Sequence, residues 1–443
     1  MRSNPTRRLR PALTALAALL AALPGFAFAQ SLQDLYEAAR VFDATFLAAR
    51  ANAQAAEHRA AQSEALLRPT LAAAASATSS QSDLPLMGSV GADTVGASLN
   101  GKYPLFNRAS GLSVQQARKA LVSAQADLES AEQDLILRLS QAYFDVLASQ
   151  DALGTTRASK TAITEQLASA KRNFEVGTAT ITDTREAQAR FDLATAQELA
   201  AENDLRTKRI ALDTLVGRSG AAPKPLLVPV VLPAPAPANA EEWVTVADQQ
   251  HPSVRRARIG LDVAQLETGK SRAAELPTVD AIASLGGSNS RGSAVLAPGT
   301  TTTATVGVQM NWPLYTGGAT QNRLKETLAL EEKSRNDLEA ARRAVAQGTR
   351  VAYFGVQSGQ AQVKALEAAE ASSKLALEAT QLGYKVGVRV NLDVLNAQTQ
   401  LFTTQRDLAK ARYDVMMGGL RLRQASGQLT ELDVQAVNRL LAK

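Results

Sequence analysis

The chain has 443 residues, of which 45% are hydrophobic, 20% are charged and only 4% are aromatic. This apolar content permits a packed core, but the scarcity of aromatic residues favours long, closely packed helices over a bulky globular core. The absence of cysteine excludes disulfide bonds, thiolate metal sites, a cysteine nucleophile and a lipid-modified N-terminal cysteine.

Residues 1–29 are predicted to be a secretory signal peptide. Four arginines precede an apolar run, and Ala27-Phe28-Ala29 forms a small-x-small cleavage site. An uncleaved membrane anchor is the alternative, but Pro24 interrupts a run that is already short for a membrane span. Cleavage removes four positive charges and lowers the net charge from +6 to about +2, so the charge does not indicate nucleic-acid or acidic partners.

Two β-hairpins are predicted, at about 68–106 and about 277–314. In the second strand of each hairpin, apolar residues alternate with polar or small ones, as at Val95 and Leu99 in the first and at Val306 in the second. Strands of about ten residues with one apolar face are typical of a membrane β-barrel wall. A soluble hairpin with one face on a core is the alternative.

Aromatic residues cluster where each second strand ends and a helix is expected to begin. These residues are Tyr103, Phe106, Trp312 and Tyr315. Amphipathic rings favour a membrane–water interface, so we interpret them as membrane-interface aromatics. Ordinary packing at a strand–helix junction is the alternative for any one of them.

Long helices follow both hairpins. No proline occurs between Pro104 and Pro223 or after Pro313, and proline breaks helix interiors. The residue choice, rich in Ala, Leu, Glu, Gln, Lys and Arg, favours helix. A single helix from Ser110 to Phe174 would be on the order of 100 Å long. Small residues at coiled-coil spacing allow such helices to approach closely.

Two similar turns interrupt the helical regions, "FEVGTATITD" and "YKVGVRVNLD". Gly177 and Gly387 suit the left-handed position that ends a helix. Asp183 and Asp393 are expected in the first turn of the next helix, where an acid meets the positive end of the helix dipole. Asn391 is expected to be the N-cap of the last long helix.

The mature chain is predicted to be an internal duplication. "YPLFN" corresponds to "WPLYTGG" and "AYFDV" to "AYFGV". Residues 219–240 hold six of the 16 prolines, which indicates an extended linker. The expected organisation is a signal peptide at 1–29, a first repeat at 30–218, a proline-rich linker at 219–240 and a second repeat at 241–443.

Four strands are too few to close a membrane barrel, since the smallest have about eight and an open edge in lipid leaves backbone groups unpaired. The chain is therefore expected to share one barrel with copies of itself. Long helices would continue from this barrel into the aqueous compartment, so that the oligomer would form a tube.

The whole mature chain resembles the TolC family of outer-membrane efflux and secretion ducts. The duplication, the strand-to-helix junctions, "FEVGTATITD", "GYKVGVRVNLDVLNAQ" and the closing "ASGQLTELDVQAVNRLL" carry this resemblance. It implies an α+β membrane protein, namely a homotrimer with a twelve-stranded outer-membrane barrel and a long α-helical coiled-coil barrel through the periplasm. It also implies drug efflux or type I protein secretion with a periplasmic adaptor and an inner-membrane transporter.

The resemblance further implies a gate at the periplasmic end of the tube, where the two turns would lie. Tyr384 and Arg389 match the family's gate-holding pair, and Thr182 and Asp183 match their partners on the first helical pair. Asp393 matches an acid that forms a ring at the narrowest point. Asn396 stands where the family pattern can place a second acid, so strong cation selectivity is not expected. The turns at Gly177 and Gly387 would dock the adaptor.

Two other classes of protein fit the sequence less well. An enzyme is disfavoured, because His58 and His251 are the only histidines and no phosphate loop, metal-ligand cluster or nucleophile–base pattern occurs. His251 precedes Pro252 and reads as a surface or capping residue. A periplasmic coiled-coil structural or adaptor protein would explain the signal and the helices, but not the two hairpins. Neither a cofactor nor a nucleic-acid partner is expected.

Overall fold

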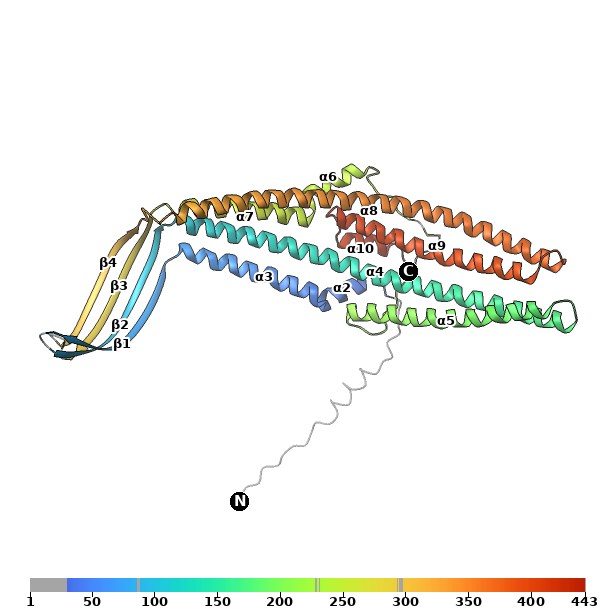
Figure 1. The fold of residues 1–443 in the computed structure, drawn as a ribbon, viewed down its shortest axis with the longest axis horizontal. Helices are drawn as coiled ribbons and strands as arrows, with labels where there is room; N and C mark the ends of the chain where they lie inside the picture. Colours follow the sequence, from blue (N-terminus) through green and yellow to red (C-terminus); the bar gives the residue numbers. More distant parts are fainter. Residues whose placement is uncertain are drawn as a thin grey trace, which may run out of the picture.

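The computed structural model describes residues 30–85, 88–227, 229–230, 232–292, 294 and 298–442. The predicted signal peptide lies outside these residues. The described chain is elongated, with a β-sheet at one end and helices that run away from it to the opposite end (Figure 1). Among the described helices, none has both the length and the apolar character that crossing a membrane requires.

The elements repeat in one order. In each repeat, two shorter helices precede a β-hairpin. A very long helix and then a helix of about half its length follow the hairpin. The second repeat ends with one additional short helix. The first repeat holds α2 (Leu32–Phe42), α3 (Ala44–Glu64), the 3₁₀ turn η1 (Ala65–Leu67), β1 (Thr70–Leu84), β2 (Gly88–Phe106), α4 (Arg108–Glu175) and α5 (Ile181–Val216). The second holds α6 (Ala240–Gln250), α7 (Pro252–Ala273), β3 (Thr278–Arg291), β4 (Gly299–Asn311), α8 (Ala319–Lys385), α9 (Asn391–Ala425) and α10 (Glu431–Asn438).

The four strands form one antiparallel sheet in the order β1-β2-β3-β4, so the two hairpins join through β2 and β3. Paired residues share a face, and the register aligns the apolar positions of all four strands. Leu99 lies opposite Ala73 on one side and Leu285 on the other, and Leu285 lies opposite Ala304. The predicted apolar face therefore extends across the whole sheet. Val306 on this face is 88% exposed in the single chain.

The other face of the sheet is polar or small. Its cross-strand pairs include Ser98 with Gly286 and Ser284 with Thr305. Near the helical end, Lys102 Nζ lies 2.8 Å from Asp280 Oδ2 and links β2 to β3. This ion pair therefore joins the two repeats on the polar face.

The helices form a curved layer with two edges. α4 has 68 residues and α8 has 67, so each is on the order of 100 Å long. α4 packs against α3, α5, α7 and α9, and α8 packs against α6, α7 and α9. α3 and α5 therefore form one edge of the layer and α8 forms the other (Figure 1).

The main core lies midway along the helices, where α2, α10 and the ends of α5 and α9 surround α4. Several of the rare aromatic residues gather here. The rings of Tyr143 and Phe144 meet edge to face at 5.7 Å, and Phe144 packs on Tyr413 at 5.8 Å. Burying each such side chain contributes about 1.5–3 kcal/mol, so this region anchors otherwise slender helices.

The proline-rich linker is fastened to this core. The hydroxyl of Tyr143 donates to the carbonyl oxygens of Lys224 at 2.9 Å and Gln30 at 3.3 Å. The backbone N–H of Leu227 donates to the carbonyl of Leu440 at 2.9 Å. The described part of 219–240 is therefore attached to the core by hydrogen bonds at Lys224 and Leu227.

His251 caps α7 rather than taking part in a chemical site. Its Nδ1 accepts a hydrogen bond from the backbone N–H of Ser253 at 3.1 Å, and Pro252 occupies the first helical position. Burial, with Arg256 nearby, lowers the pKa of His251 and favours the neutral ring that can accept this bond. The predicted capping role is confirmed.

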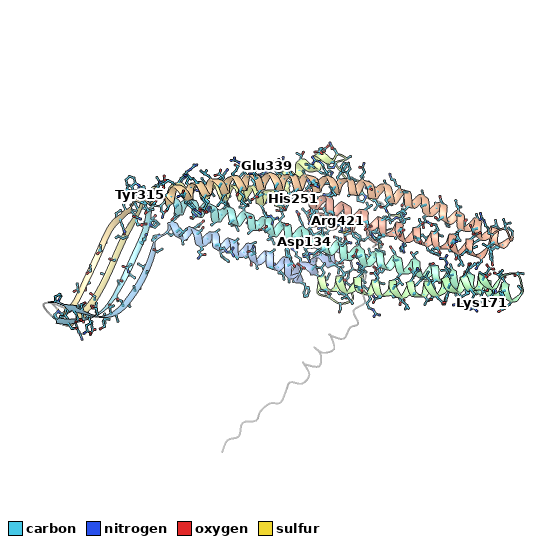
Figure 2. The ribbon with its side chains drawn as sticks, in the orientation of Figure 1. Asp134, Lys171, His251, Tyr315, Glu339 and Arg421 are labelled. Carbon is cyan, nitrogen blue, oxygen red and sulfur yellow. The ribbon has the colours of Figure 1, made fainter. Side chains whose placement is uncertain are left out.

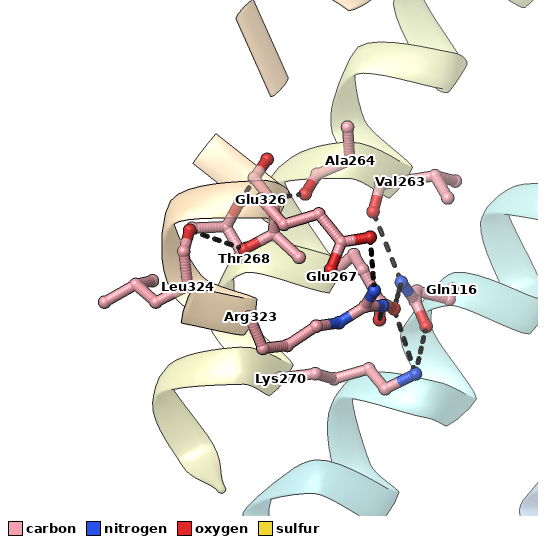
Figure 3. A network of polar contacts seen from close by, with 10 residues as sticks. Gln116, Val263, Ala264, Glu267, Thr268, Lys270, Arg323, Leu324 and Glu326 are labelled. Atoms are coloured by element: carbon pink, nitrogen blue, oxygen red, sulfur yellow. Dashed lines mark hydrogen bonds and ion pairs between the residues drawn. The ribbon is translucent and has the colours of Figure 1, made fainter. Parts of the chain in front are cut away.

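A polar network near the sheet joins α4, α7 and α8 (Figure 3). Glu267 on α7 accepts hydrogen bonds from Gln116 of α4 at 2.9 Å, from Lys270 at 3.0 Å and from Arg323 of α8 at 2.8 Å. The Gln116 amide, followed by the two cations, lowers the pKa of Glu267 to about 2 against the opposing effect of burial. One carboxylate thus ties three long helices together just below the strands.

Replacing Glu267 by Gln is expected to lower the melting temperature at neutral pH. Because the folded-state pKa is about 2 and the ordinary value is 4.5, the stabilisation is complete above pH 4.5 and is lost as the pH falls towards 2. Hydrogen bonds to a charged group contribute about 1.5–3 kcal/mol. The helical circular-dichroism signal of detergent-solubilised protein, followed through thermal unfolding at several pH values, would measure this change.

The control for this change is Glu332→Gln, which removes an ion pair to Arg335 whose side chains are both 58% exposed. It is expected to change the melting temperature little. If the melting temperatures of the wild type and of Glu267→Gln fell by the same amount as the pH drops below 4.5, the stabilising role of this network would be contradicted.

Candidate functional site at the helix ends

The two predicted turns lie together at the end of the helices that is farthest from the sheet. α4 ends at Glu175 and α8 at Lys385, and in each case a glycine with positive φ follows the cap residue. Gly177 has φ of 78° and Gly387 has φ of 79°. In Figure 2, Lys171 marks this end and Tyr315 marks the junction with the sheet.

The backbone of each turn closes in the same way. The N–H of Thr178 donates to the carbonyl of Asn173 at 2.8 Å, and the N–H of Val388 donates to that of Gly383 at 2.9 Å. The glycine N–H in each turn also donates to the carbonyl three residues earlier, and the two bonds together form the Schellman motif. The sequence correctly predicted both helix-ending glycines, since a left-handed residue here is inexpensive only for glycine.

The two following helices begin differently. Thr180 caps α5, and Asp183 completes a capping box by accepting from the N–H of Thr180 at 2.9 Å. The predicted N-cap at Asn391 is wrong, because Val390 is the N-cap of α9 and makes no side-chain cap bond. Asn391 is instead buried at 2% exposure, and its side chain bonds to Gln166 of α4. The asparagine amide thus serves helix packing rather than helix initiation.

Near the turns, three polar contacts between described residues join the first helical pair to the second within one chain. Asn173 Nδ2 of α4 donates to the Tyr384 hydroxyl of α8 at 3.1 Å. Gln166 of α4 donates to Asn391 of α9. An Arg190 Nη of α5 donates to Asn396 Oδ1 of α9 at 3.0 Å. Tyr384 and Asn396 were singled out from the sequence, whereas Gln166, Asn173 and Arg190 were not.

Arg389 and Asp393 form an ion pair on one side of the second turn, with Nη1 and Oδ2 3.6 Å apart. Arg389 lies across Gly383, where an added Cβ would come within 2.8 Å of the arginine Cγ. Asp183 binds its own helix start. Among the described residues, no hydrogen bond or ion pair joins Arg389 or Tyr384 to Asp183, and none involves the Thr182 side chain.

Both turns expose apolar side chains. Val386, Val388 and Val390 are exposed around the second turn, and Val176 and Ile181 around the first. Val388 is 78% exposed. Ordinary loop ends are polar, so a group of exposed valines on both turns is typical of a surface that meets another protein.

The four predicted interface aromatics lie at the other end, where sheet and helices meet. Tyr103, Phe106, Trp312 and Tyr315 are all exposed, with Tyr315 at 86%. The Trp312 indole N–H donates to the Glu275 carbonyl at 3.2 Å, which fixes this ring to the segment just after α7. Among the described residues, no group of three or more His, Asp or Glu side chains is arranged to hold a metal ion.

Comparison with known proteins identifies the fold. The model of the outer membrane efflux protein family matches residues 35–218 and 243–428, which correspond to the two repeats. The chain belongs to the outer membrane efflux protein family. The family is one of transport channels and not of enzymes.

Relatives and solved structures agree with this assignment. The chain is 34% identical to outer membrane protein TolC of Vibrio cholerae, over 96% of each chain. It is 32% identical to the alkaline protease secretion protein AprF of Pseudomonas aeruginosa, over 93% of this chain and 87% of that one. The crystal structure of VceC from Vibrio cholerae matches with a TM-score of 0.76 at 21% identity, over 89% of this chain and 96% of that one.

Membership of this family confirms the fold class, the outer-membrane location and the role as an exit channel for efflux or type I secretion. It removes the alternative of a periplasmic structural or adaptor protein without a pore. The roles of the individual site residues remain predictions.

Proposed function

We propose that three copies of this chain form one outer-membrane duct that a periplasmic gate closes. The observation that carries this proposal is the open four-stranded sheet with a continuous apolar face, joined to helices on the order of 100 Å long. β1 and β4 are the edges of the sheet. In lipid an open edge leaves backbone groups unpaired, so β4 of one copy pairs with β1 of the next and twelve strands close a barrel.

The helical layer supports the same assembly. Its edges carry solvent-exposed apolar side chains: Leu199 and Ile210 on α5, and Val351, Phe354 and Leu375 on α8. Each is more than half exposed. Contact of α8 with α5 of the next copy would bury them and continue the helical layer around a tube. The same neighbour relation that closes the sheet thus closes the helical barrel.

In this duct the apolar face of the sheet faces lipid. Tyr103, Phe106, Trp312 and Tyr315 lie at its periplasmic boundary, where amphipathic rings are favoured. The polar face, with the Lys102–Asp280 pair, lines the water-filled interior. The helices carry the channel onward through the periplasm.

The helix ends form the entrance. Tyr384 and Arg389 hold the closed state, with Thr182 and Asp183 of a neighbouring helical pair as their partners across the copies. Asp393 and Asn396 line the narrowest point. The exposed valines around Gly177 and Gly387 dock a periplasmic adaptor, which connects the duct to an inner-membrane transporter. Substrates, whether small molecules or proteins, pass from the periplasm to the exterior.

The test is reconstitution of the purified protein in planar lipid bilayers, together with its mass in detergent. A trimer that inserts and gives small, stable single-channel currents is the expected result. A monomeric protein that never inserts would refute the duct.

A further inference from the structure

The periplasmic entrance carries an excess of positive charge. Residues 171–190 hold four basic and three acidic side chains, and the corresponding residues 381–400 hold two and one. Each turn region is therefore +1, and one chain contributes +2 at this end. This local charge equals the net charge of about +2 expected for the whole mature chain.

Within this positively charged region, Arg190 is a residue whose charge is not offset by a carboxylate of any described residue. Arg190 has the spacing to pair with Glu186 on its own helix, yet its guanidinium extends to the neutral Asn396 of α9 at 3.0 Å. Arg389 lies in the turn that precedes α9, and Asp393 and Asn396 lie three residues apart on one face of α9. The Asp393 carboxylate is offset by Arg389 at 3.6 Å, whereas no carboxylate is paired with Arg190 among the described residues.

A groove of about 320 Å³ extends this basic surface away from the turns. It lies between α5 and α9 with α4 as its floor, and Arg190 and Arg406 both line it. Its other polar groups are neutral, including Thr155, Gln197 and Thr403, and no acidic residue lines it. Arg406 is paired with Asp407 at 3.0 Å, a residue outside the lining, so Arg190 is the principal uncompensated charge.

We propose that the entrance of this channel admits anions in preference to cations and that Arg190, held by Asn396, is the residue that determines this selectivity. The inference rests on the proposed gate at the helix ends. Three copies would place three such guanidinium groups around the entrance, where they attract solutes with carboxylate or other anionic groups and repel cations. Screening limits the effect to within about 10 Å at 0.1 M salt, so it is strongest in dilute salt.

The experiment is the reversal potential of reconstituted channels in a dilute KCl gradient. Since K⁺ and Cl⁻ have nearly equal mobilities in water, its sign reports the preference directly. The wild type is expected to favour Cl⁻. Arg190→Gln is expected to reduce the chloride-to-potassium permeability ratio by about two- to fivefold, by removing one unit charge per copy. Arg190→Lys retains the charge and is expected to preserve the ratio.

Two further variants sharpen the test. Asn396→Asp places a carboxylate against Arg190 and is expected to shift the ratio towards K⁺ as Arg190→Gln does. Arg218→Gln removes the same charge from the exposed residue after α5, far from the turns, and is expected to leave the ratio unchanged. If the wild type favours K⁺ and Arg190→Gln has the same chloride-to-potassium permeability ratio, this inference is overturned while the proposed duct stands. Absence of current from every variant would overturn the proposed duct itself.

Discussion

Replacing Tyr384 by Phe and Arg389 by Ser in the same chain is expected to raise the open fraction of the reconstituted channel by about tenfold or more. The Tyr384 hydroxyl accepts from Asn173 at 3.1 Å and so joins α8 to α4. A hydrogen bond of this kind contributes about 1 kcal/mol net. The exposed ion pair proposed between Arg389 and Asp183 of a neighbouring copy would contribute up to about 1 kcal/mol. Three copies multiply these small terms, so their joint loss favours the open state.

Single-channel conductance in planar bilayers measures this effect directly. Tyr315→Phe with Arg218→Ser is the matched control, since it makes the same two chemical changes at exposed positions away from the turns. Its conductance is expected to equal that of the wild type. If the Tyr384→Phe, Arg389→Ser channel also conducts like the wild type, these two residues do not hold the gate.

The fold could be predicted from the sequence wherever the signal was local. Alternation of apolar and polar residues identified both hairpins, and the absence of proline delimited α4 and α8. Gly177 and Gly387 were recognised because a positive φ is a property of one residue. The junction of the two hairpins through β2 and β3 carried no local signal, since strand pairing depends on the register of segments far apart in the chain.

The contacts of the site could not be predicted in the same way. Asn173, Gln166 and Arg190 bind residues more than 200 positions away, and their pairing depends on how two long helices cross. At Asn391, local preference and tertiary packing conflict. Local preference makes asparagine an N-cap, but burial against α4 gives its amide oxygen a partner on Gln166, and Val390 takes the cap position. Tertiary packing overrode the local preference.

Substitutions at Gly177 and Gly387 can distinguish a structural role of the turns from a docking role. Gly177 and Gly387 have positive φ, and an added Cβ would meet nothing within 4 Å at either position. A Cβ at either position would therefore meet no neighbour, and the left-handed conformation would cost valine about 1–2 kcal/mol of backbone strain per residue. We expect Gly177→Val with Gly387→Val to abolish export and to leave the trimer intact, because the strands and the central core lie far from the turns.

Complementation of export in cells, combined with the oligomer mass of the purified protein, measures both outcomes. Asparagine at the same two positions is the control, because it tolerates the left-handed conformation while adding a side chain of similar size. If asparagine retains export and valine does not, the conformation of the turns is what the partner needs. If both lose export while the trimer persists, the added side chains obstruct the valine-rich surface itself. Loss of the trimer together with export would contradict a docking role, since the turns would then stabilise the assembly rather than contact its partner.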